Sequence, residues 1–567
     1  MSRAPWVLLC ASLAGHEARA PGPPREPQLA APLEPLWVDR SAELLPGVAT
    51  TCGSPEKRWI LEVNGGGVAL GDFDGDGNLD LVVVDGSTLE RVAAGEPGFP
   101  PRLFLGAETG RLRPAGEAWR MAGGRWGTGV ATGDVDGDGW LDLFVAEWGR
   151  DRLFLNQEGR GFRELGEESG LAGERWSTSA AFLDYDGDGA LDLVVASYLA
   201  FHVGEVPSAG SSGCRWKGHP VLCGPEGLVP VHDRLYRGRG DGTFEDVSLA
   251  AGFRPERAGY GLGVTTLDFD LDGDTDVYVA NDSTPNHLWR NAGDGTFVEV
   301  GSSAGVAYDA DGREQAGMGI ACGDWSGDGR PDLFVTNFSG EANALYRSTA
   351  NGRFRESASA ARLYGPSLAR LGWGTGFGDF DLDGDLDLFT FNGHVYPEAD
   401  LAGTDTSYAQ PDELCEALAE GRFRVRRLAA GTGGAARPDV VSRAATCGDL
   451  DGDGDLDLVA LAVEGPVRVL VNEAPRATSH WLRVRLRARG ANRDALGALV
   501  RVEAGGRSFS QEIRTAGGFQ AAVPAEAHFG LGERARIERL VVRWPGGREQ
   551  VLEDVAVDRV LSIEERE

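Results

Sequence analysis

The sequence predicts an all-β protein, a seven-bladed β-propeller followed by a small β-sandwich. Glycine accounts for 83 of the 567 residues and methionine for only 3, which favours tight turns over packed helices. One acidic phrase recurs seven times within residues 36–474, and an apolar, strand-like run follows each copy. A supersecondary unit repeated in this way is typical of propeller blades.

The first 20 residues have the pattern of an export signal. Arg3 precedes a short apolar run, and residues 18–20 (Ala-Arg-Ala) have the small-x-small form of a cleavage site. The proline-rich residues 21–35 are predicted to form an extended linker. No later run reaches the roughly 18 apolar residues of a transmembrane span. We therefore expect a secreted or cell-surface protein, with lipid anchoring through Cys10 as an alternative.

The chain is strongly acidic. It has 55 basic and 87 acidic residues, and its formal net charge is −32. Such a field repels the phosphates of nucleic acids and anionic lipids, and it attracts cations. We therefore expect no nucleic-acid partner.

The repeated phrase has the form D-x-D-x-D-G-x-x-D. The seven copies, called loops 1 to 7 below, begin at Asp72, Asp134, Asp184, Asp268, Asp324, Asp379 and Asp449. Oxygen ligands at positions 1, 3, 5 and 9, a backbone carbonyl at position 7 and a glycine at position 6 for the sharp turn suit a hard cation. Mg²⁺ accepts fewer protein ligands than Ca²⁺ does, so the pattern favours Ca²⁺. A single such loop also fits a plain Asp/Gly turn, whereas seven copies in register with strands favour metal.

We expect about seven Ca²⁺ ions per chain on these grounds. Ser326 replaces an aspartate in loop 5, which is therefore expected to be the weakest site. The expected ligands are Asp72, Asp74, Asp76 and Asp80 in loop 1; Asp134, Asp136, Asp138 and Asp142 in loop 2; Asp184, Asp186, Asp188 and Asp192 in loop 3; Asp268, Asp270, Asp272 and Asp276 in loop 4; Asp324, Ser326, Asp328 and Asp332 in loop 5; Asp379, Asp381, Asp383 and Asp387 in loop 6; and Asp449, Asp451, Asp453 and Asp457 in loop 7.

The strand before each loop carries small residues at every second position. Seven, five and three residues before the first aspartate, all copies have Gly, Ala, Ser or Thr. A stripe without side-chain bulk predicts that this strand meets other backbone closely, as at a propeller axis. Two further strands and a third that opens with an aromatic residue complete a four-stranded unit.

The propeller is expected to close by joining its two ends. The seventh unit lacks an outer strand, because residues 473–475 (Glu-Ala-Pro) replace the usual turn. Residues 36–41 have the pattern of an outer strand but precede loop 1. We therefore predict that residues 36–41 pair antiparallel with residues 467–472.

Cysteines indicate the redox compartment. Cys214 and Cys223 flank a short stretch of the long insertion between loops 3 and 4. In an oxidising compartment this pair is expected to form a disulfide, and two free thiols are the alternative. Cys322 and Cys447 belong to units that are not neighbours, so we expect buried free thiols there.

Residues 475–567 alternate polar and apolar side chains between glycine turns, which predicts a small antiparallel β-sandwich. Its core is expected to contain Trp481, Phe519, Phe529 and Trp544, with an exposed aromatic platform as the alternative. His528 is expected to form a structural hydrogen bond.

The repeats resemble FG-GAP/VCBS propeller repeats. The tail resembles an ASPIC/UnbV domain at residues 492–502 (NRDALGALVRV), 528–532 (HFGLG) and 541–547 (VVRWPGG). This pairing is that of the cartilage acidic protein family. The resemblance implies a secreted, calcium-binding protein with a propeller over 36–474 and an ASPIC/UnbV-like β-sandwich over 475–567.

The sequence contains none of the motifs of a serine nucleophile or a zinc site. The preferred interpretation is a non-enzymatic, monomeric recognition or adhesion protein that binds a glycan or a protein through propeller loops. The alternative is a calcium-assisted polysaccharide lyase or hydrolase. His287 and His394 are its candidates for a general base, although both positions also suit a structural histidine.

Overall fold

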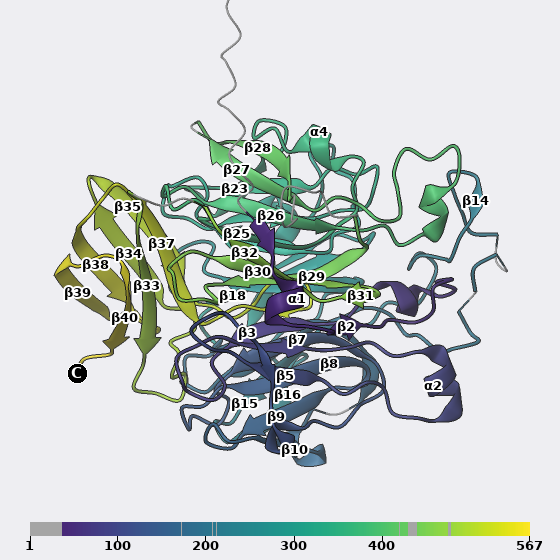
Figure 1. Ribbon diagram of the computed structural model, residues 1–567, viewed down its shortest axis with the longest axis horizontal. Helices are drawn as coiled ribbons and strands as arrows, with labels where there is room; N and C mark the ends of the chain where they lie inside the picture. The colour runs from purple at the N-terminus through teal and green to yellow at the C-terminus, as the bar shows by residue number, and fades with distance from the viewer. Residues whose placement is uncertain are drawn as a thin grey trace, which may run out of the picture.

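The computed structural model describes residues 37–171, 173–206, 208–210, 213–418, 420–428, 439–474 and 478–567. The predicted export signal, the linker and Cys10 lie outside these residues. Strands dominate the regular structure of the described chain and the helices are short, which confirms the all-β class (Figure 1).

Four-stranded antiparallel units succeed one another along the chain, and the described residues form seven of them. Units 1 to 3 are β3 (Val68–Gly71), β4 (Asp80–Val83), β5 (Arg102–Leu105) and β6 (Arg113–Pro114); β7 (Gly127–Gly133), β8 (Asp142–Arg150), β9 (Arg152–Asn156) and β10 (Phe162–Leu165); and β11 (Glu174–Leu183), β12 (Asp192–Ser197), β15 (Arg234–Gly238) and β16 (Phe244–Asp246). Units 4 and 5 are β17 (Gly261–Leu267), β18 (Asp276–Asn281), β19 (His287–Asn291) and β20 (Phe297–Glu299); and β21 (Ile320–Gly323), β22 (Asp332–Val335), β23 (Ala344–Thr349) and β24 (Arg353–Glu356). Units 6 and 7 are β25 (Gly372–Gly378), β26 (Asp387–Asn392), β27 (Glu413–Leu418) and β28 (Arg422–Arg427); and β29 (Ser442–Gly448), β30 (Asp457–Ala462), β32 (Arg468–Asn472) and β1 (Trp37–Asp39).

Short elements connect these units. Two small ribbons pair β2 (Ala49–Thr50) with β31 (Gly465–Pro466) and β13 (Arg215–Trp216) with β14 (His219–Pro220). The helices are α1 (Ser41–Leu44), α2 (Leu89–Ala94), α3 (Gly301–Ala304) and α4 (Tyr364–Ser367), and the 3₁₀ turns are η1 (Ile60–Val63), η2 (Glu117–Trp119), η3 (Glu167–Ser169) and η4 (Pro397–Asp400).

Apolar side chains between neighbouring units form the core of the propeller. One cluster joins units 1 and 2, with Val82 facing Val145. Another joins units 7 and 1, with Val459 and Leu81, and so closes the ring. Each strand pair therefore buries one face against the preceding unit and the other against the following unit.

The predicted closure of the ring is confirmed. β1 pairs antiparallel with β32, and Trp37 lies opposite Asn472 while Asp39 lies opposite Leu470. Trp37 is only 3% exposed, and its ring packs edge-on against Phe380 of unit 6 at 5.4 Å. The first described strand thus completes the last unit and covers the outer edge of β32.

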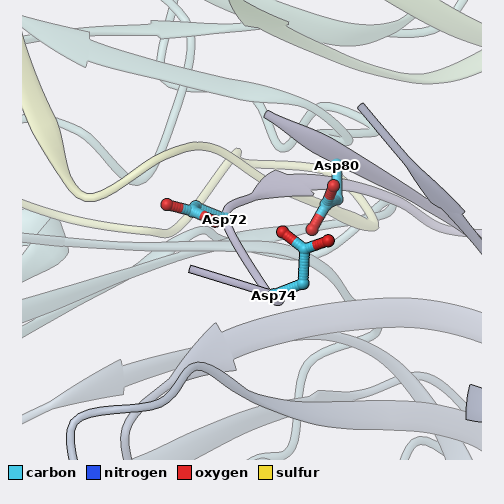
Figure 2. A group of neighbouring side chains, drawn as sticks. All are labelled: Asp72, Asp74 and Asp80. Atoms are coloured by element: carbon cyan, nitrogen blue, oxygen red, sulfur yellow. The ribbon is translucent and has the colours of Figure 1, made fainter. Parts of the chain in front are cut away.

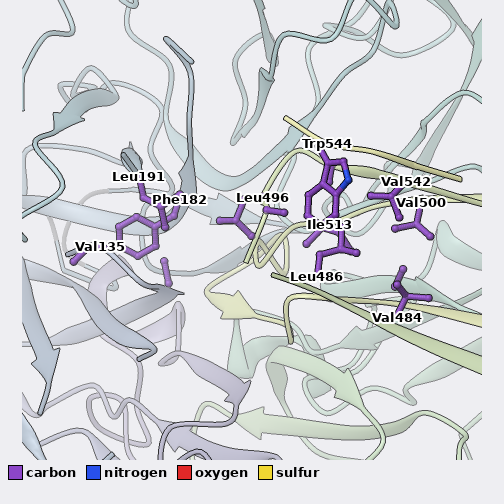
Figure 3. Close-up of a cluster of buried hydrophobic side chains, with 14 of the residues drawn as sticks. Val135, Phe182, Leu191, Val484, Leu486, Leu496, Val500, Ile513, Val542 and Trp544 are labelled. Atoms are coloured by element: carbon purple, nitrogen blue, oxygen red, sulfur yellow. The ribbon is translucent and has the colours of Figure 1, made fainter. Parts of the chain in front are cut away.

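The tail forms two facing sheets beside the propeller (Figure 1). Its strands are β33 (His480–Arg487), β34 (Leu499–Ala504), β35 (Arg507–Glu512), β36 (Ala521–Ala522), β37 (Glu526–Gly532), β38 (Ile537–Arg543), β39 (Glu549–Val555) and β40 (Arg559–Glu564). The prediction of a purely antiparallel sandwich is wrong, because β33 pairs parallel with β40. The apolar core of the tail is continuous with that of units 2 and 3, as Figure 3 shows for Leu496, Leu191 and Phe182.

Residues 515–523 of the tail, called the plug below, enter the propeller. Within the plug, β36 pairs parallel with the inner strand β3 of unit 1. The carbonyl of Gly518 accepts a hydrogen bond from the Val264 N–H of unit 4, at 3.0 Å. The N–H of Gln520 donates to the Ser179 hydroxyl of unit 3, at 2.8 Å. The inner strands with their small residues therefore surround a segment of the tail.

Two of the four residues predicted for the tail core, Phe519 and Trp481, lie elsewhere. Phe519 is fully buried, but its ring lies 5.0 Å from Trp373 of unit 6, among propeller side chains. Trp481 is half-buried and packs so closely on Gly454 of loop 7 that a Cβ there would lie 1.9 Å from the indole. Phe529 and Trp544 do belong to the tail core. Burial between domains and burial within one domain leave the same apolar pattern in a sequence.

The insertion of unit 3 reaches across to unit 6. Cys214 and Cys223 form a disulfide with a Cα–Cα distance of 5.5 Å. Trp216 lies 4.5 Å from the ring of His394, and Lys217 pairs with Asp405 of the unit 6 loop. The insertion therefore covers part of the propeller face opposite the acidic loops.

Strand β1 should contribute substantially to stability. Trp37→Ala removes a buried ring from the last unit and should lower the free energy of unfolding by about 3–5 kcal/mol. Leu249→Ala is the control, because Leu249 is 76% exposed. Urea unfolding followed by circular dichroism measures both. Equal stability of the two variants would contradict the closure.

Candidate metal centres

Each acidic loop is shaped by its first aspartate and its glycine. In all seven loops, the N–H of the glycine at position 6 donates to Oδ2 of the aspartate at position 1, at 2.8 to 3.1 Å. These glycines have positive φ, for example +92° at Gly77 and +100° at Gly273, which other residues rarely adopt. The repeated glycine is thus required by the turn.

Carboxylate oxygens converge in these loops. In loops 1 to 4, positions 1, 3 and 9 each bring one oxygen to within 4.8 Å of the others, and in loop 6 positions 1, 3 and 5 do so. Figure 2 shows this group in loop 1, where Asp72, Asp74 and Asp80 lie around the start of β4. The position 5 residues of loops 1 to 4 are exposed.

Some of these buried oxygens have no hydrogen-bond partner. They include Oδ1 of Asp72, Asp134, Asp184 and Asp268, all at position 1. Such an atom normally costs free energy, because nothing replaces its lost hydration. An all-oxygen donor set with unpartnered atoms directed inward fits a hard cation.

The raised pKa values of the buried aspartates also favour a cation in these loops. Burial raises the pKa of Asp80 and of Asp134 to about 7, and that of Asp192 to about 8. Neighbouring carboxylates of the same loop raise these pKa values further, whereas backbone N–H groups lower them. The ionised loops are therefore disfavoured without a positive charge nearby.

The aspartate at position 9 also has a structural role that sequence reading missed. One oxygen accepts an N–H from its own loop and the other an N–H from the end of the third strand, as Asp142 does from Val135 at 2.9 Å and Asn156 at 2.7 Å. This pair of bonds recurs in all seven units. The position 9 aspartates are 0–3% exposed. Each one joins a loop to the outer half of its unit.

An asparagine links some loops to the next unit. The side-chain Nδ2 of Asn156, Asn291 and Asn472 donates to a loop carbonyl of the preceding unit, at 2.7 to 2.9 Å. All three end the third strand of their unit. That shared position was visible in the sequence, but it lies outside the acidic phrase.

The tail contacts the first aspartate of three loops. Arg543 Nη2 lies 2.6 Å from Asp268 in loop 4, and Arg483 Nη1 lies 2.7 Å from Asp449 in loop 7. In loop 5, the hydroxyl of Ser510 donates to Asp324 at 3.0 Å. Arg543 lies within the tail motif 541–547, whereas Arg483 and Ser510 lie outside the quoted motifs, and nothing in the sequence connects any of the three with an acidic loop.

His287, His394 and His528 are the histidines with predicted roles. His394 is fully buried, and its ring lies 2.9 Å from the Ser339 hydroxyl while it accepts the Tyr396 N–H at 3.1 Å. His287 is 7% exposed and lies 4.0 Å from Asp233. Burial lowers the pKa of His394 to about 3 and that of His287 to about 4. His528 bonds to the Gly454 carbonyl at 2.9 Å, in agreement with its predicted structural role.

These features define a class of protein, a β-propeller with repeated acidic turn loops and a β-domain seated on them. Residues 72–145, 134–195, 224–279, 268–335 and 324–390 match the FG-GAP-like repeat, and residues 488–567 match the ASPIC and UnbV family. The chain belongs to the FG-GAP-like repeat proteins that carry an ASPIC and UnbV tail.

The curated relatives include cartilage acidic protein 1 of mouse and of human. The mouse protein is 31% identical over 357 residues, which cover 60% of this chain and 50% of the relative. The human protein is 31% identical over 359 residues, with 60% and 49% covered. The chain thus spans about half the length of these relatives. A solved lectin structure from Agrocybe aegerita has a TM-score of 0.37 and 16% identity, with 66% of this chain and 89% of the lectin covered.

None of the helices in the described residues has the length and apolar character that a membrane crossing requires.

The asparagine link between units should be measurable. Asn472→Ala leaves the buried Phe380 carbonyl without this partner, so the free energy of unfolding should fall by about 1–3 kcal/mol. Asn351→Ala, at an exposed position, is the matched control. Chemical unfolding of both variants tests this, and an Asn472→Ala protein as stable as the control would refute the link.

Proposed function

We propose that loops 1 to 7 bind Ca²⁺, about seven ions per chain. The observation that carries this proposal is the set of converging carboxylates with unpartnered, buried oxygens at position 1. Seven divalent ions would bring the formal net charge from −32 to −18. Neutralising the ionised loops is the physical benefit of binding.

Loop 5 is proposed as the weakest site. Ser326 supplies a neutral hydroxyl where the other loops have a carboxylate, and its Oγ is buried without a hydrogen-bond partner. A hydroxyl is a weaker ligand for Ca²⁺ than a carboxylate, because it lacks the negative charge.

Calcium titration followed by native mass spectrometry should reach a plateau near seven ions. Chelation should lower the melting temperature, because ions bound only to the folded state stabilise it by mass action. Ser326→Asp should strengthen one site, whereas Ser302→Asp, which adds the same charge on exposed surface, should not. A plateau at two ions or fewer, or an unchanged melting temperature, would contradict the proposal.

We further propose that the chain is a secreted or cell-surface recognition or adhesion protein without catalytic activity, acting as a monomer. The domain limits that we propose are 36–474 for the propeller and 475–567 for the tail. The disulfide between Cys214 and Cys223 supports an oxidising compartment. The relation to cartilage acidic protein 1 is consistent with this assignment.

The partner, a glycan or a protein, is proposed to bind the propeller face opposite the tail. The tail contacts the loop face, whereas the connections between second and third strands lie at the other end of each unit. Side chains exposed there or in the insertion include Val229 at 67%, Leu401 at 49% and Val203 at 47%. We propose that these exposed apolar side chains contribute to the partner surface.

Glycan and protein arrays, probed with the full chain in calcium and again in chelator, test this role. We expect calcium-dependent binding that Val229→Asp weakens. Val551→Asp, at a 40% exposed position of β39, is the control for added charge. Binding that Val551→Asp reduces and Val229→Asp does not would place the partner on the tail.

A further inference from the structure

The tail contacts at least six of the seven acidic loops by hydrogen bonds or ion pairs, and loop 3 through apolar packing. Polar contacts reach loops 1, 2, 4, 5, 6 and 7. In loop 6, for example, the Gly532 N–H donates to the Leu382 carbonyl at 2.7 Å. In loop 3, Leu191 joins the tail core (Figure 3). The shape of the loops therefore sets the surface on which the tail sits.

Three of these contacts use the aspartate at position 1 of an acidic loop, which is also an expected cation ligand. Oδ2 of Asp268 accepts from Arg543 and from the glycine of its own turn, at 2.6 and 3.1 Å. Its Oδ1 is buried without a hydrogen-bond partner, and Asp268 belongs to the converging group of loop 4. One side chain thus serves the tail with one oxygen and the candidate site with the other. Asp449 also binds the tail through Oδ2, which accepts from Arg483, while its Oδ1 accepts the Gly452 N–H at 2.8 Å.

The positive charge of these arginines is partly offset inside the interface. Glu526 accepts two bonds from Arg483, at 2.9 and 3.1 Å. Arg483 is 4% exposed and Glu526 is 6% exposed at the side chain. A guanidinium held this way can orient Asp449 without placing a full uncompensated charge beside a bound cation.

The plug depends on the strands that make these contacts. β35 precedes the plug and carries Ser510, and β37 follows it and carries His528. Because both strands are joined to the plug by the backbone, a shift of either strand away from the loops would displace the plug. The Thr515 hydroxyl bonds to Thr132 at 2.8 Å and the Ala522 carbonyl accepts from Thr446 at 2.8 Å, so the plug touches units 2 and 7 as well.

We propose that cation occupancy of loops 4, 5 and 7 is coupled to seating of the plug, with Arg543, Ser510 and Arg483 as the positioning residues. A bound cation fixes the position of the shared carboxylate, and the tail then binds a rigid partner. By reciprocity, a seated tail strengthens cation binding at these loops. This inference rests on the calcium binding proposed above.

Hydrogen–deuterium exchange of the full chain tests the coupling. Chelation should speed exchange of the plug amides by about 5–150-fold, the usual range of coupling between two sites. The amides of Gly518, Gln520 and Val523 report on the plug. Plug exchange that stays the same while native mass spectrometry shows the ions leaving would overturn the proposal.

Aspartate-to-asparagine variants of three loops distinguish the proposed coupling from a general effect of losing one ion. Asp268→Asn and Asp449→Asn should each lose one ion and loosen the plug. Asp184→Asn should lose one ion and leave plug exchange unchanged, because no tail residue of the described chain bonds to Asp184. If Asp184→Asn speeds plug exchange as much as Asp268→Asn and Asp449→Asn do, the inference is refuted.

The reverse direction has its own test. Arg543→Gln leaves every loop ligand intact but removes the guanidinium group that binds Asp268. Calcium affinity at one site should therefore fall by about 5-fold or more. Arg536→Gln is the control, because Arg536 pairs with Asp554 on exposed surface of the tail. Unchanged affinity in Arg543→Gln would contradict the coupling. A chain that binds no calcium in any variant would overturn this inference and the proposed function together, whereas normal binding with an unresponsive plug would overturn this inference alone.

Discussion

Seven buried carboxylates at position 9 of the acidic loops connect the parts of each propeller unit. Both oxygens of each one accept a backbone N–H, one from the loop and one from the third strand. The surrounding protein removes water from these groups, and burial raises the pKa of Asp192 to about 8. An ionised carboxylate in such a place requires positive charge or hydrogen-bond donors. Backbone donors partly meet this need at position 9, whereas at position 1 the Oδ1 atoms of loops 1 to 4 have no hydrogen-bond partner and still need compensation.

Two different parts of the molecule can supply that compensation. The all-oxygen donor sets of the loops suit a hard cation, and the arginines of the tail bring guanidinium groups to the same face. Because Asp268 and Asp449 belong to both arrangements, the tail is not an independent domain on a tether. Its seat and the acidic loops share residues, and the plug extends that seat into the centre of the propeller.

Local reasoning predicted the repeat and one contact between distant segments, but it missed the other long-range contacts of the tail. The pairing of β1 with β32 followed from one unit that lacked a strand and one strand that lacked a unit. The pattern of the tail strands was also correct, yet the parallel pairing of β33 with β40 was not foreseen, because alternation carries no strand direction. Phe519 was assigned to the wrong core for a similar reason, since its apolar character does not reveal which surface buries it.

The sequence by itself determined the all-β class, the positions of the seven acidic loops and the closure of the ring. These follow from spacing and side-chain chemistry within short stretches, which the chain repeats often enough to be unambiguous. Only the tertiary structure decided that the tail sits on the loop face, that Arg483 and Arg543 meet the position 1 aspartates and that the plug fills the ring. Those contacts join residues far apart in sequence, and their energy depends on shape and distance that no local pattern records.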